Sequence, residues 1–77
     1  MGKKSFKYDK VLCRKFGKKI AECRKDREWT QEELAFKAGI SASYLGAIER
    51  GTTDTTISTV KRLSKAFRTE LSELLKF

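Results

Sequence analysis

Two cysteines are the side chains of this sequence with the greatest capacity for metal or redox chemistry. Cys13 and Cys23 lie ten residues apart without a CxxC pair, and the chain contains no histidine. The sequence therefore lacks the usual ligand set for zinc and the residue pair for Cys/His catalysis. No nucleophile stands beside a base either, so the sequence predicts neither an enzyme nor a metal or cofactor site. We interpret both cysteines as small apolar side chains on a helix, reduced in a cytoplasmic protein.

Positive charge is the second chemical signal, and it is concentrated at one end of the chain. The net charge is +8; residues 1–27 hold eleven Lys or Arg against three Asp or Glu, whereas residues 28–77 hold seven of each. Such a block is either a solvated face or a surface that attracts an anionic polymer or membrane. No long apolar run or signal-peptide pattern indicates membrane insertion or secretion.

The elements that position these side chains are predicted to be helices, because the chain has no proline and its apolar residues recur at spacings of three and four. We expect one all-α domain over residues 9–77, preceded by a flexible basic arm over residues 1–8. Helices are predicted over about 9–27, 31–38 and 42–50, from residue 57, and in "LSELLKF". The predicted apolar stripe of the first helix is Leu12, Phe16, Ile20 and Cys23. That of the fourth is Ile57, Val60, Leu63 and Phe67.

Local signals mark the ends of these helices. Thr30 and Glu33 form the capping-box pattern ahead of the second helix. Ser41 and Thr56 are expected to cap the third and fourth helices. The glycines suited to the left-handed position after a helix are Gly39 and Gly51. The second and third helices are only about two turns long, and helices that short are marginal alone, so both must pack against the rest of the chain.

The segment "FGKKIAECRKDREWTQEELAFKAGISASYLGAIERG" resembles the helix-turn-helix domains of the lambda-repressor-like (XRE-type) family, and "TISTVKRLSKAF" looks like that family's fourth helix. The resemblance covers about residues 16–75. The residues at the family's motif spacing are Gln31, Leu34, Ala35, Gly39, Ile40, Ser41, Ile48, Glu49 and Gly51. It implies a five-helix fold with the helix-turn-helix at the second and third helices. The length is similar to phage Cro-type repressors and to controller proteins of restriction-modification systems.

The third helix is predicted to present a binding face. Leu45 and Ile48 are expected to point into the core. This places Ser43, Gly46, Ala47 and Arg50 outward, with Ala42 and Tyr44 on the flanks. A glycine costs a helix about 1 kcal/mol relative to alanine, so Gly46 suggests that a ligand approaches the helix closely. A DNA major groove about 12 Å wide is such a ligand, and a tolerated surface glycine is the alternative.

The resemblance implies that this third helix is the recognition helix. The residues that would face base edges and backbone are Ser41, Ala42, Ser43 and Tyr44. Many members of the family carry Arg or Gln near Ala42, where alanine offers only an apolar contact. We therefore expect readout to depend more on Ser43, Tyr44, Arg50 and DNA shape.

Contacts to the DNA backbone are expected from other segments. Gln31 matches a family position that touches phosphate. Thr52, Thr53 and Thr55 either donate hydroxyls to the backbone or serve only in loop and cap bonds. From their charge, Lys3, Lys4 and Lys7 of the arm are expected to follow the DNA backbone or an adjacent groove.

Two structural roles also follow from the resemblance. Arg24 and Glu49 match positions that typically form an ion pair between the first and third helices, so we expect a structural clamp. Trp29 replaces the more usual leucine before the second helix, and we interpret it as filling the core rather than stacking on a base.

The fifth helix is predicted to contribute to a homodimer. Its apolar residues are more than a seven-residue end segment can bury against one small core: Leu71, Leu74, Leu75 and Phe77. A symmetric dimer would present two recognition helices about 34 Å apart and read a palindromic operator. The alternative is that the three leucines all serve the monomer core.

Taken together, these patterns predict a dimeric, sequence-specific regulator of transcription that binds double-stranded DNA. The sequence leaves open whether it represses or activates. The competing classes are an antitoxin-like or other protein-binding module with the same fold, and a basic amphipathic helix that docks on anionic lipid. Lipid docking would require the apolar stripe of the first helix to be free, whereas Phe16 and Ile20 occupy positions that are core positions in the family.

Overall fold

The computed structural model describes residues 8–77 and contains five α-helices, in agreement with the predicted fold class. They are α1 (Lys10–Asp26), α2 (Gln31–Ala38), α3 (Ala42–Arg50), α4 (Ile57–Phe67) and α5 (Leu71–Leu74). Strands are absent from this part of the chain. The predicted arm residues Lys3, Lys4 and Lys7 lie outside the described residues. No helix between Tyr8 and Phe77 has the length and apolar character that crossing a membrane requires.

Side-chain caps fix where the helices begin, as the sequence predicts. The Thr30 hydroxyl accepts the Glu33 N–H at 3.0 Å, and the Glu33 carboxylate accepts the Thr30 N–H at 2.7 Å, which completes the capping box. Ser41 accepts the N–H of Tyr44 at 3.0 Å. Thr56 likewise accepts the N–H of Thr59 at 3.1 Å. These bonds satisfy N–H groups of the first turn that have no partner within the helix.

Two glycines end α2 and α3 in the left-handed conformation, with φ of 71° at Gly39 and 73° at Gly51. After Gly39 the Ile40 N–H donates to the Ala35 carbonyl at 3.0 Å, so the turn into α3 is closed by backbone bonds. The end of α4 differs, because Arg68 rather than a glycine adopts φ of 57° there. Residues other than glycine seldom adopt this conformation, so no feature of the sequence predicts it.

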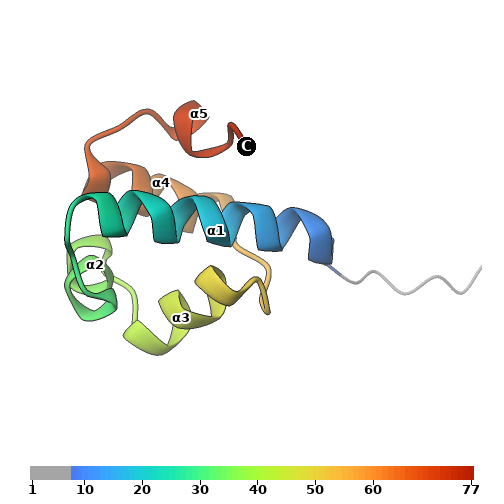
Figure 1. The fold of residues 1–77 in the computed structure, drawn as a ribbon, viewed down its shortest axis with the longest axis horizontal. Helices are drawn as coiled ribbons and strands as arrows, with labels where there is room; N and C mark the ends of the chain where they lie inside the picture. The colour runs from blue at the N-terminus through green and yellow to red at the C-terminus, as the bar shows by residue number, and fades with distance from the viewer. Residues whose placement is uncertain (1–7) are drawn as a thin grey trace, which may run out of the picture.

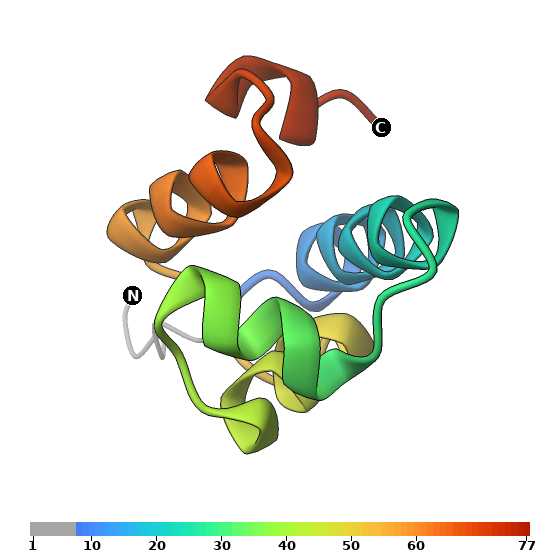
Figure 2. The same ribbon diagram turned by 90° about the vertical axis from the view of Figure 1, so that its left-hand side faces the viewer.

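α1 runs through the length of the molecule and separates two groups of helices (Figure 1). α2 and α3 lie on one side of it, and α5 lies on the other; α4 packs against α2 and α5 (Figure 2). The core between them is formed by eleven side chains. The largest fully buried apolar residues are Ile20, Leu34, Leu45, Ile48, Leu63 and Leu74. Neither short helix of the helix-turn-helix therefore has to be stable by itself.

α1 and α3 cross at Gly17, a residue that the sequence analysis did not single out. A Cβ atom at Gly17 would collide with the Ile48 carbonyl oxygen and would lie 2.8 Å from the Glu49 carbonyl oxygen. The backbone of α3 thus occupies the space that a side chain at this position would need. The signal in the sequence was a glycine in the middle of a helix, where it costs stability unless a close approach requires it.

Two apolar residues assigned to the buried stripes are exposed instead. Leu12 is 51% exposed, and Cys13 beside it is buried at 8%. Ile57 at the start of α4 is 67% exposed. The first turns of α1 extend beyond the other helices (Figure 1). Leu12 and Ile57 line an open hollow with Phe77 there instead of packing in the core. Phe16, Ile20, Val60, Leu63 and Phe67 are buried as predicted.

Candidate nucleic-acid interface

The buried and exposed sides of α3 agree largely with the helical-wheel prediction. Leu45 and Ile48 are 0% and 1% exposed and hold the helix against the core. Ser43 and Arg50 are exposed; Ala42, Tyr44 and Ala47 are half-buried. The exposed N-cap Ser41 uses its hydroxyl to accept the Tyr44 N–H, so the first turn of α3 is fixed. A rigid helix thus displays a hydroxyl, a methyl, a phenol and a guanidinium along its outer side.

Position 46 faces away from the core, toward Arg50 and Gln31, but it is not open to solvent. It is buried, because the side chains of Arg50 and Gln31 extend over it. A Cβ at position 46 would lie 3.1 Å from Arg50 Nη1 and 3.9 Å from Gln31 Oε1. The missing side chain therefore leaves room for the Arg50 guanidinium to lie close to the helix. Whether DNA also approaches Gly46 stays a prediction.

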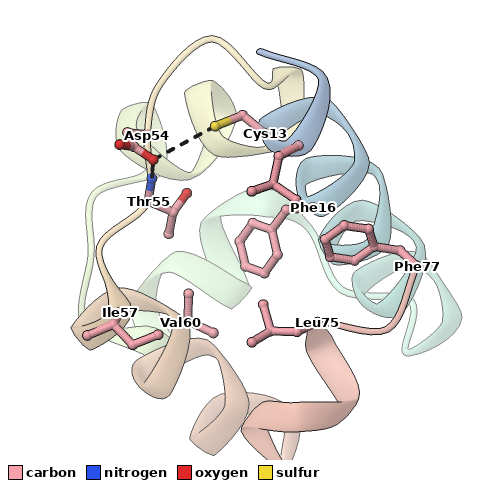
Figure 3. A pocket seen from close by; sticks show the side chains of 9 residues that line it. Cys13, Phe16, Asp54, Thr55, Ile57, Val60, Leu75 and Phe77 are labelled. Atoms are coloured by element: carbon pink, nitrogen blue, oxygen red, sulfur yellow. Dashed lines mark hydrogen bonds between the residues drawn. The ribbon is translucent and has the colours of Figure 1, made fainter. Parts of the chain in front are cut away.

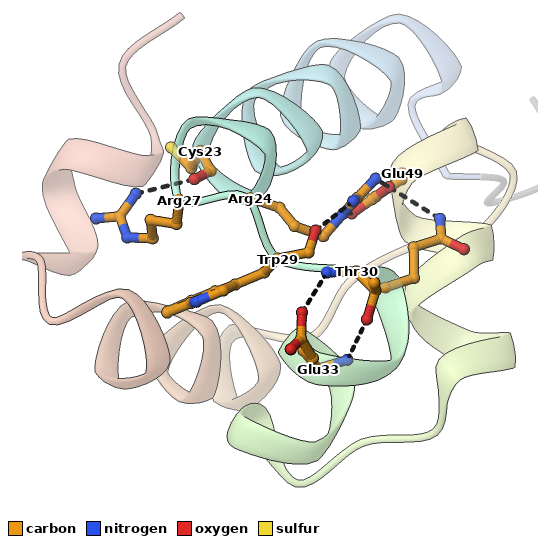
Figure 4. Close-up of polar contacts among 8 residues, drawn as sticks. Cys23, Arg24, Arg27, Trp29, Thr30, Glu33 and Glu49 are labelled. Atoms are coloured by element: carbon orange, nitrogen blue, oxygen red, sulfur yellow. Dashed lines mark hydrogen bonds and ion pairs between the residues drawn. The ribbon is translucent and has the colours of Figure 1, made fainter.

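The ends of α1 and α3 are joined by the predicted clamp (Figure 4). Arg24 Nε donates to Glu49 Oε2 at 2.8 Å and Arg24 Nη2 donates to Glu49 Oε1 at 3.0 Å, while the two side chains are only 12% and 6% exposed. Hydrogen bonding to Glu49 raises the pKa of the Arg24 guanidinium above its ordinary value. The third donor, Nη1, bonds the Trp29 carbonyl at 2.8 Å. A bidentate pair of this kind fixes orientation as well as distance.

Gln31 belongs to the same cluster, which the sequence did not indicate. Its Nε2 donates to Glu49 Oε1 at 2.9 Å, so Glu49 receives bonds from both α1 and α2. The predicted phosphate contact of Gln31 is untested, and its amide N–H is occupied by Glu49 in this structure. The cluster of Arg24, Gln31 and Glu49, hereafter the polar clamp, holds the N-terminus of α2 and the C-terminus of α3 to α1.

Trp29 fills space beside the core, as predicted. Its ring is parallel to the ring of Phe67 within 4°, with the centroids 5.9 Å apart. The Arg27 guanidinium lies 4.7 Å from the Phe67 centroid and donates to the Cys23 carbonyl at 2.9 Å. Lys37 Nζ is 4.9 Å from the Trp29 centroid. With an aromatic ring and cations around it, Trp29 is not free to stack on a base.

Hydroxyl groups of the segment between α3 and α4 are engaged in local bonds. Thr52 donates to the Ala47 carbonyl at 3.3 Å, and Thr53 donates to the Asp54 carbonyl at 3.4 Å. The Thr55 N–H bonds Asp54 Oδ1 at 3.1 Å. Thr52 is exposed and Thr53 is half-buried, so neither bond removes these side chains from the surface. Their contact with DNA remains a prediction.

The C-terminal segment divides the four residues assigned to a dimer interface. Leu74 is 1% exposed and lies in the monomer core, so its assignment is wrong; α5 places it against α1 and α4. Leu71 is half-buried against the same core. Leu75 and Phe77 are 44% and 49% exposed. This seven-residue end segment thus buries only one of its leucines completely, because only one side of its single helical turn faces the core.

Leu75 and Phe77 border an open hollow of about 150 Å³ beside the N-terminal half of α1, whereas the polar clamp involves its C-terminal half (Figure 3). The Phe77 ring meets the Phe16 ring edge to face, with 6.4 Å between centroids. We call this hollow the apolar groove. Its apolar lining includes Leu12, Cys13, Phe16, Ile57, Leu75 and Phe77. Leu12 and Ile57 belong to the predicted core stripes of α1 and α4, so the sequence pattern does not distinguish this second apolar surface from the core.

Cys13 lies at the edge of this groove next to Asp54. Its Sγ is 3.9 Å from Asp54 Oδ1, to which the thiol donates. Burial raises the pKa of the Cys13 thiol, and the nearby carboxylates of Asp54 and Asp9 raise it further. The thiol therefore stays protonated near neutral pH, which fits its interpretation as a small apolar side chain.

The family follows from this arrangement and from the sequence together. The family model for HTH_3 helix-turn-helix proteins matches residues 20–74, and the chain belongs to this family. It is a transcriptional regulator of the helix-turn-helix type. Among its relatives, the control protein C.BamHI of Bacillus amyloliquefaciens is 33% identical over 63 residues, which are 80% of this chain and 78% of that protein.

Solved structures show the same fold. The restriction-modification controller protein C.AhdI from Aeromonas hydrophila is similar with a TM-score of 0.81 and 34% identity, over 83% of this chain and 97% of that one. The biofilm regulator SinR, from Bacillus subtilis, was solved in complex with DNA. It is similar with a TM-score of 0.74 and 34% identity, over 79% of this chain and 98% of that one.

Proposed function

We propose that this regulator binds a palindromic DNA operator as a homodimer, with α3 in the major groove. The observation that carries the proposal is the way α3 is held. Leu45 and Ile48 bury one side of it, and the polar clamp fixes its C-terminus, which leaves the opposite side for a ligand. A helix presented rigidly by one apolar side and one polar anchor is suited to reading base edges without rearrangement.

The roles of the individual residues follow from their chemistry and exposure. Ser41, Ser43 and Tyr44 lie at the N-terminal end of α3, where a recognition helix contacts base edges. The methyl group of Ala42 suits contact with a thymine methyl. Arg50 can leave its position over Gly46 to reach a phosphate or a base edge. Backbone contacts are proposed from Gln31, Thr52 and Thr53, and from Lys3 and Lys4 of the arm.

The dimer is proposed to form through the apolar groove rather than through Leu74. The exposed members of the groove include Leu12, Ile57, Leu75 and Phe77, which are between 44% and 67% exposed. A cluster of large apolar side chains on the surface of a small domain is typical of a protein interface. In a symmetric dimer, a second copy of the chain covers these residues, and the first copy covers the same residues of the second. The two α3 helices of the dimer then face the two half-sites of one operator.

Selection of bound sequences from random double-stranded DNA tests this function. We expect a palindromic consensus with half-sites about one helical turn apart, roughly 34 Å between centres. A Ser43→Glu/Ala47→Glu variant should keep the melting temperature of the wild type and lose binding, because it places two negative charges on the outer side of α3. Enrichment of no sequence by the wild type would contradict the proposal and favour the antitoxin-like, protein-binding alternative.

A further inference from the structure

One side of α4 carries a concentration of positive charge that the neutral balance of residues 28–77 conceals. Lys61, Lys65 and Arg68 follow at spacings of four and three, which place them on one side of the helix. All three are exposed, and α4 itself contains no acidic residue. The ion pairs found between Tyr8 and Phe77 join Arg24 to Glu49 and Lys76 to Glu73, so none of these three cations is paired there. We call Lys61, Lys65 and Arg68 the α4 basic face.

This face continues to the turn that leads into the recognition helix. Arg62 Nη1 lies 3.1 Å from the position that a Cβ on Gly39 would occupy, so α4 reaches the turn between α2 and α3. Lys61 and Lys65 line a shallow depression together with Lys37 and Gly39 of that turn region. The next depression along α4 is lined by Lys61, Lys65 and Arg68 together with one acidic residue, Glu70. Figure 2 shows α2 beside α4, with α3 below α2.

Packing does not explain why the cations are there. Like charges four residues apart on a helix destabilise it, so Lys61 and Lys65 oppose the stability of α4. No carboxylate lies within ion-pair distance of their exposed ammonium groups in the part of the chain that the structure describes, although Glu70 lines the same depression. Cations near the C-terminus of a helix are favoured by its dipole, which accounts for Lys65 and Arg68 but not for Lys61 in the second turn.

We propose that the α4 basic face binds the sugar–phosphate backbone of DNA next to the base pairs that α3 reads. The proposal rests on the proposed function of α3, because the face continues from the turn at Gly39. From Lys61 to Arg68 the face is about 10 Å long, at about 1.5 Å per residue. The phosphates of one strand are about 3.4 Å apart along the DNA axis, so this length corresponds to about three phosphates. Contacts of this kind add affinity and salt dependence without sequence preference.

The test compares a variant of the face with a matched variant elsewhere. Lys61→Gln/Lys65→Gln removes two charges and keeps a good helix-forming residue at both positions. Lys15→Gln/Lys18→Gln is the control, since it removes the same charge from exposed positions of α1 beside Lys76 and Phe77. Sedimentation and thermal melting establish first that both variants keep the oligomeric state and stability of the wild type.

Binding is then measured against salt concentration on the selected operator, with short flanks and with flanks longer by one helical turn. On the longer duplex, Lys61→Gln/Lys65→Gln should flatten the slope of log K against log salt by about 1.8 per bound subunit, at about 0.9 per phosphate contact. The slope on the short duplex and the slopes of the control variant should stay as in the wild type. Hydroxyl-radical protection of the flanking backbone should disappear in the same variant.

Three results would overturn the inference. The first is an unchanged slope of log K against log salt for Lys61→Gln/Lys65→Gln on the longer duplex. This would mean that the α4 basic face does not bind DNA and would favour an acidic protein as its partner. The second is an equal flattening in the Lys15→Gln/Lys18→Gln control, which would mean that only net charge matters. If the wild type itself binds selected and random duplexes equally, the proposed function of α3 fails, and the α4 basic face loses its ligand with it.

Discussion

The two halves of α1 are covered in opposite ways. Around its C-terminal half, donors meet acceptors at close distance: Arg24 bonds Glu49 and the Trp29 carbonyl, and Arg27 bonds the Cys23 and Phe67 carbonyls. Around its N-terminal half, Leu12, Ile57 and Phe77 leave apolar surface exposed beside an open groove. The donors and acceptors of one half are thus satisfied within this chain, whereas the other half leaves large apolar side chains exposed.

This difference separates two tasks that a small regulator must perform. Hydrogen bonds are directional, so the polar clamp sets the angle at which α3 leaves the core. Apolar contact is not directional and requires only complementary surface, so the apolar groove can be covered by another molecule without altering that angle. The comparison predicts that changes in the clamp alter folding, whereas changes in the groove alter association.

The largest effect is expected from the polar clamp. Arg24→Ala leaves the Glu49 carboxylate buried with Gln31 as its remaining side-chain partner, and loss of one member of a buried pair costs about 3–5 kcal/mol. Urea denaturation measures this loss. Lys76→Ala, which breaks the exposed pair with Glu73, is the control and should leave the unfolding midpoint unchanged. A cost for Arg24→Ala below about 1 kcal/mol would place the clamp among ordinary surface pairs.

The next effect concerns the crossing of α1 and α3, which lies between the two halves. Gly17→Ala should cost about 1–3 kcal/mol because its Cβ meets the backbone of α3 at Ile48 and Glu49. Gly46→Ala is the matched change, and it meets only the flexible end of Arg50. We expect Gly46→Ala to leave stability unchanged or raise it by up to about 1 kcal/mol. Equal destabilisation by both changes in thermal melts would contradict the close crossing.

A smaller effect, on association alone, is expected from the apolar groove. Ile57→Glu should weaken the dimer at least about tenfold, or about 1.4 kcal/mol, while unfolding of the monomer is unchanged. Analytical ultracentrifugation across a range of concentrations measures this. Phe36→Glu is the control, because Phe36 is 87% exposed on α2, away from the groove. If both variants sediment like the wild type, the groove is not the dimer interface.

The smallest effect is expected from the pH dependence of Cys13. Since the pKa of this thiol is raised in the folded state, the proton is held more tightly there than in the unfolded chain. The corresponding stability is fully present below the ordinary thiol pKa of 9.0, and it is lost as the pH rises through the folded-state pKa. Cys13→Ala should therefore flatten the decline of stability above pH 9 relative to the wild type. Cys23→Ala serves as the control, and identical curves for Cys13→Ala and the wild type would contradict the assignment.

Local features of the fold could be predicted closely because each depends on a few neighbouring residues. The capping box of Thr30 and Glu33 and the left-handed glycines 39 and 51 occur where the sequence indicated. The clamp of Arg24 and Glu49 was expected only from the family resemblance, because the partners are 25 residues apart in the chain. Gln31 was missed as its third member for the same reason.

Burial was predicted less well, because a helical wheel gives the relative directions of side chains and not what lies opposite them. Leu12 belongs to the expected stripe of α1, but it is 51% exposed and borders an open hollow instead of the core. Leu74 was expected to meet a partner subunit, yet it points from α5 into the monomer core. Gly46 was expected to be open, yet two long polar side chains cover it.

The sequence by itself determined the number and type of helices, their caps and the family, because these depend on spacing along the chain. The tertiary structure decided which apolar and charged side chains remain exposed and which of them lie together. It placed the exposed Leu12, Ile57, Leu75 and Phe77 around one groove, although they come from both ends and the middle of the sequence. It also gathered Lys61, Lys65 and Arg68 on one side of α4, where Glu70 is the one acidic residue that lines the same depression. Charge and apolar area act through space, and the chain order does not fix distances between residues far apart in it.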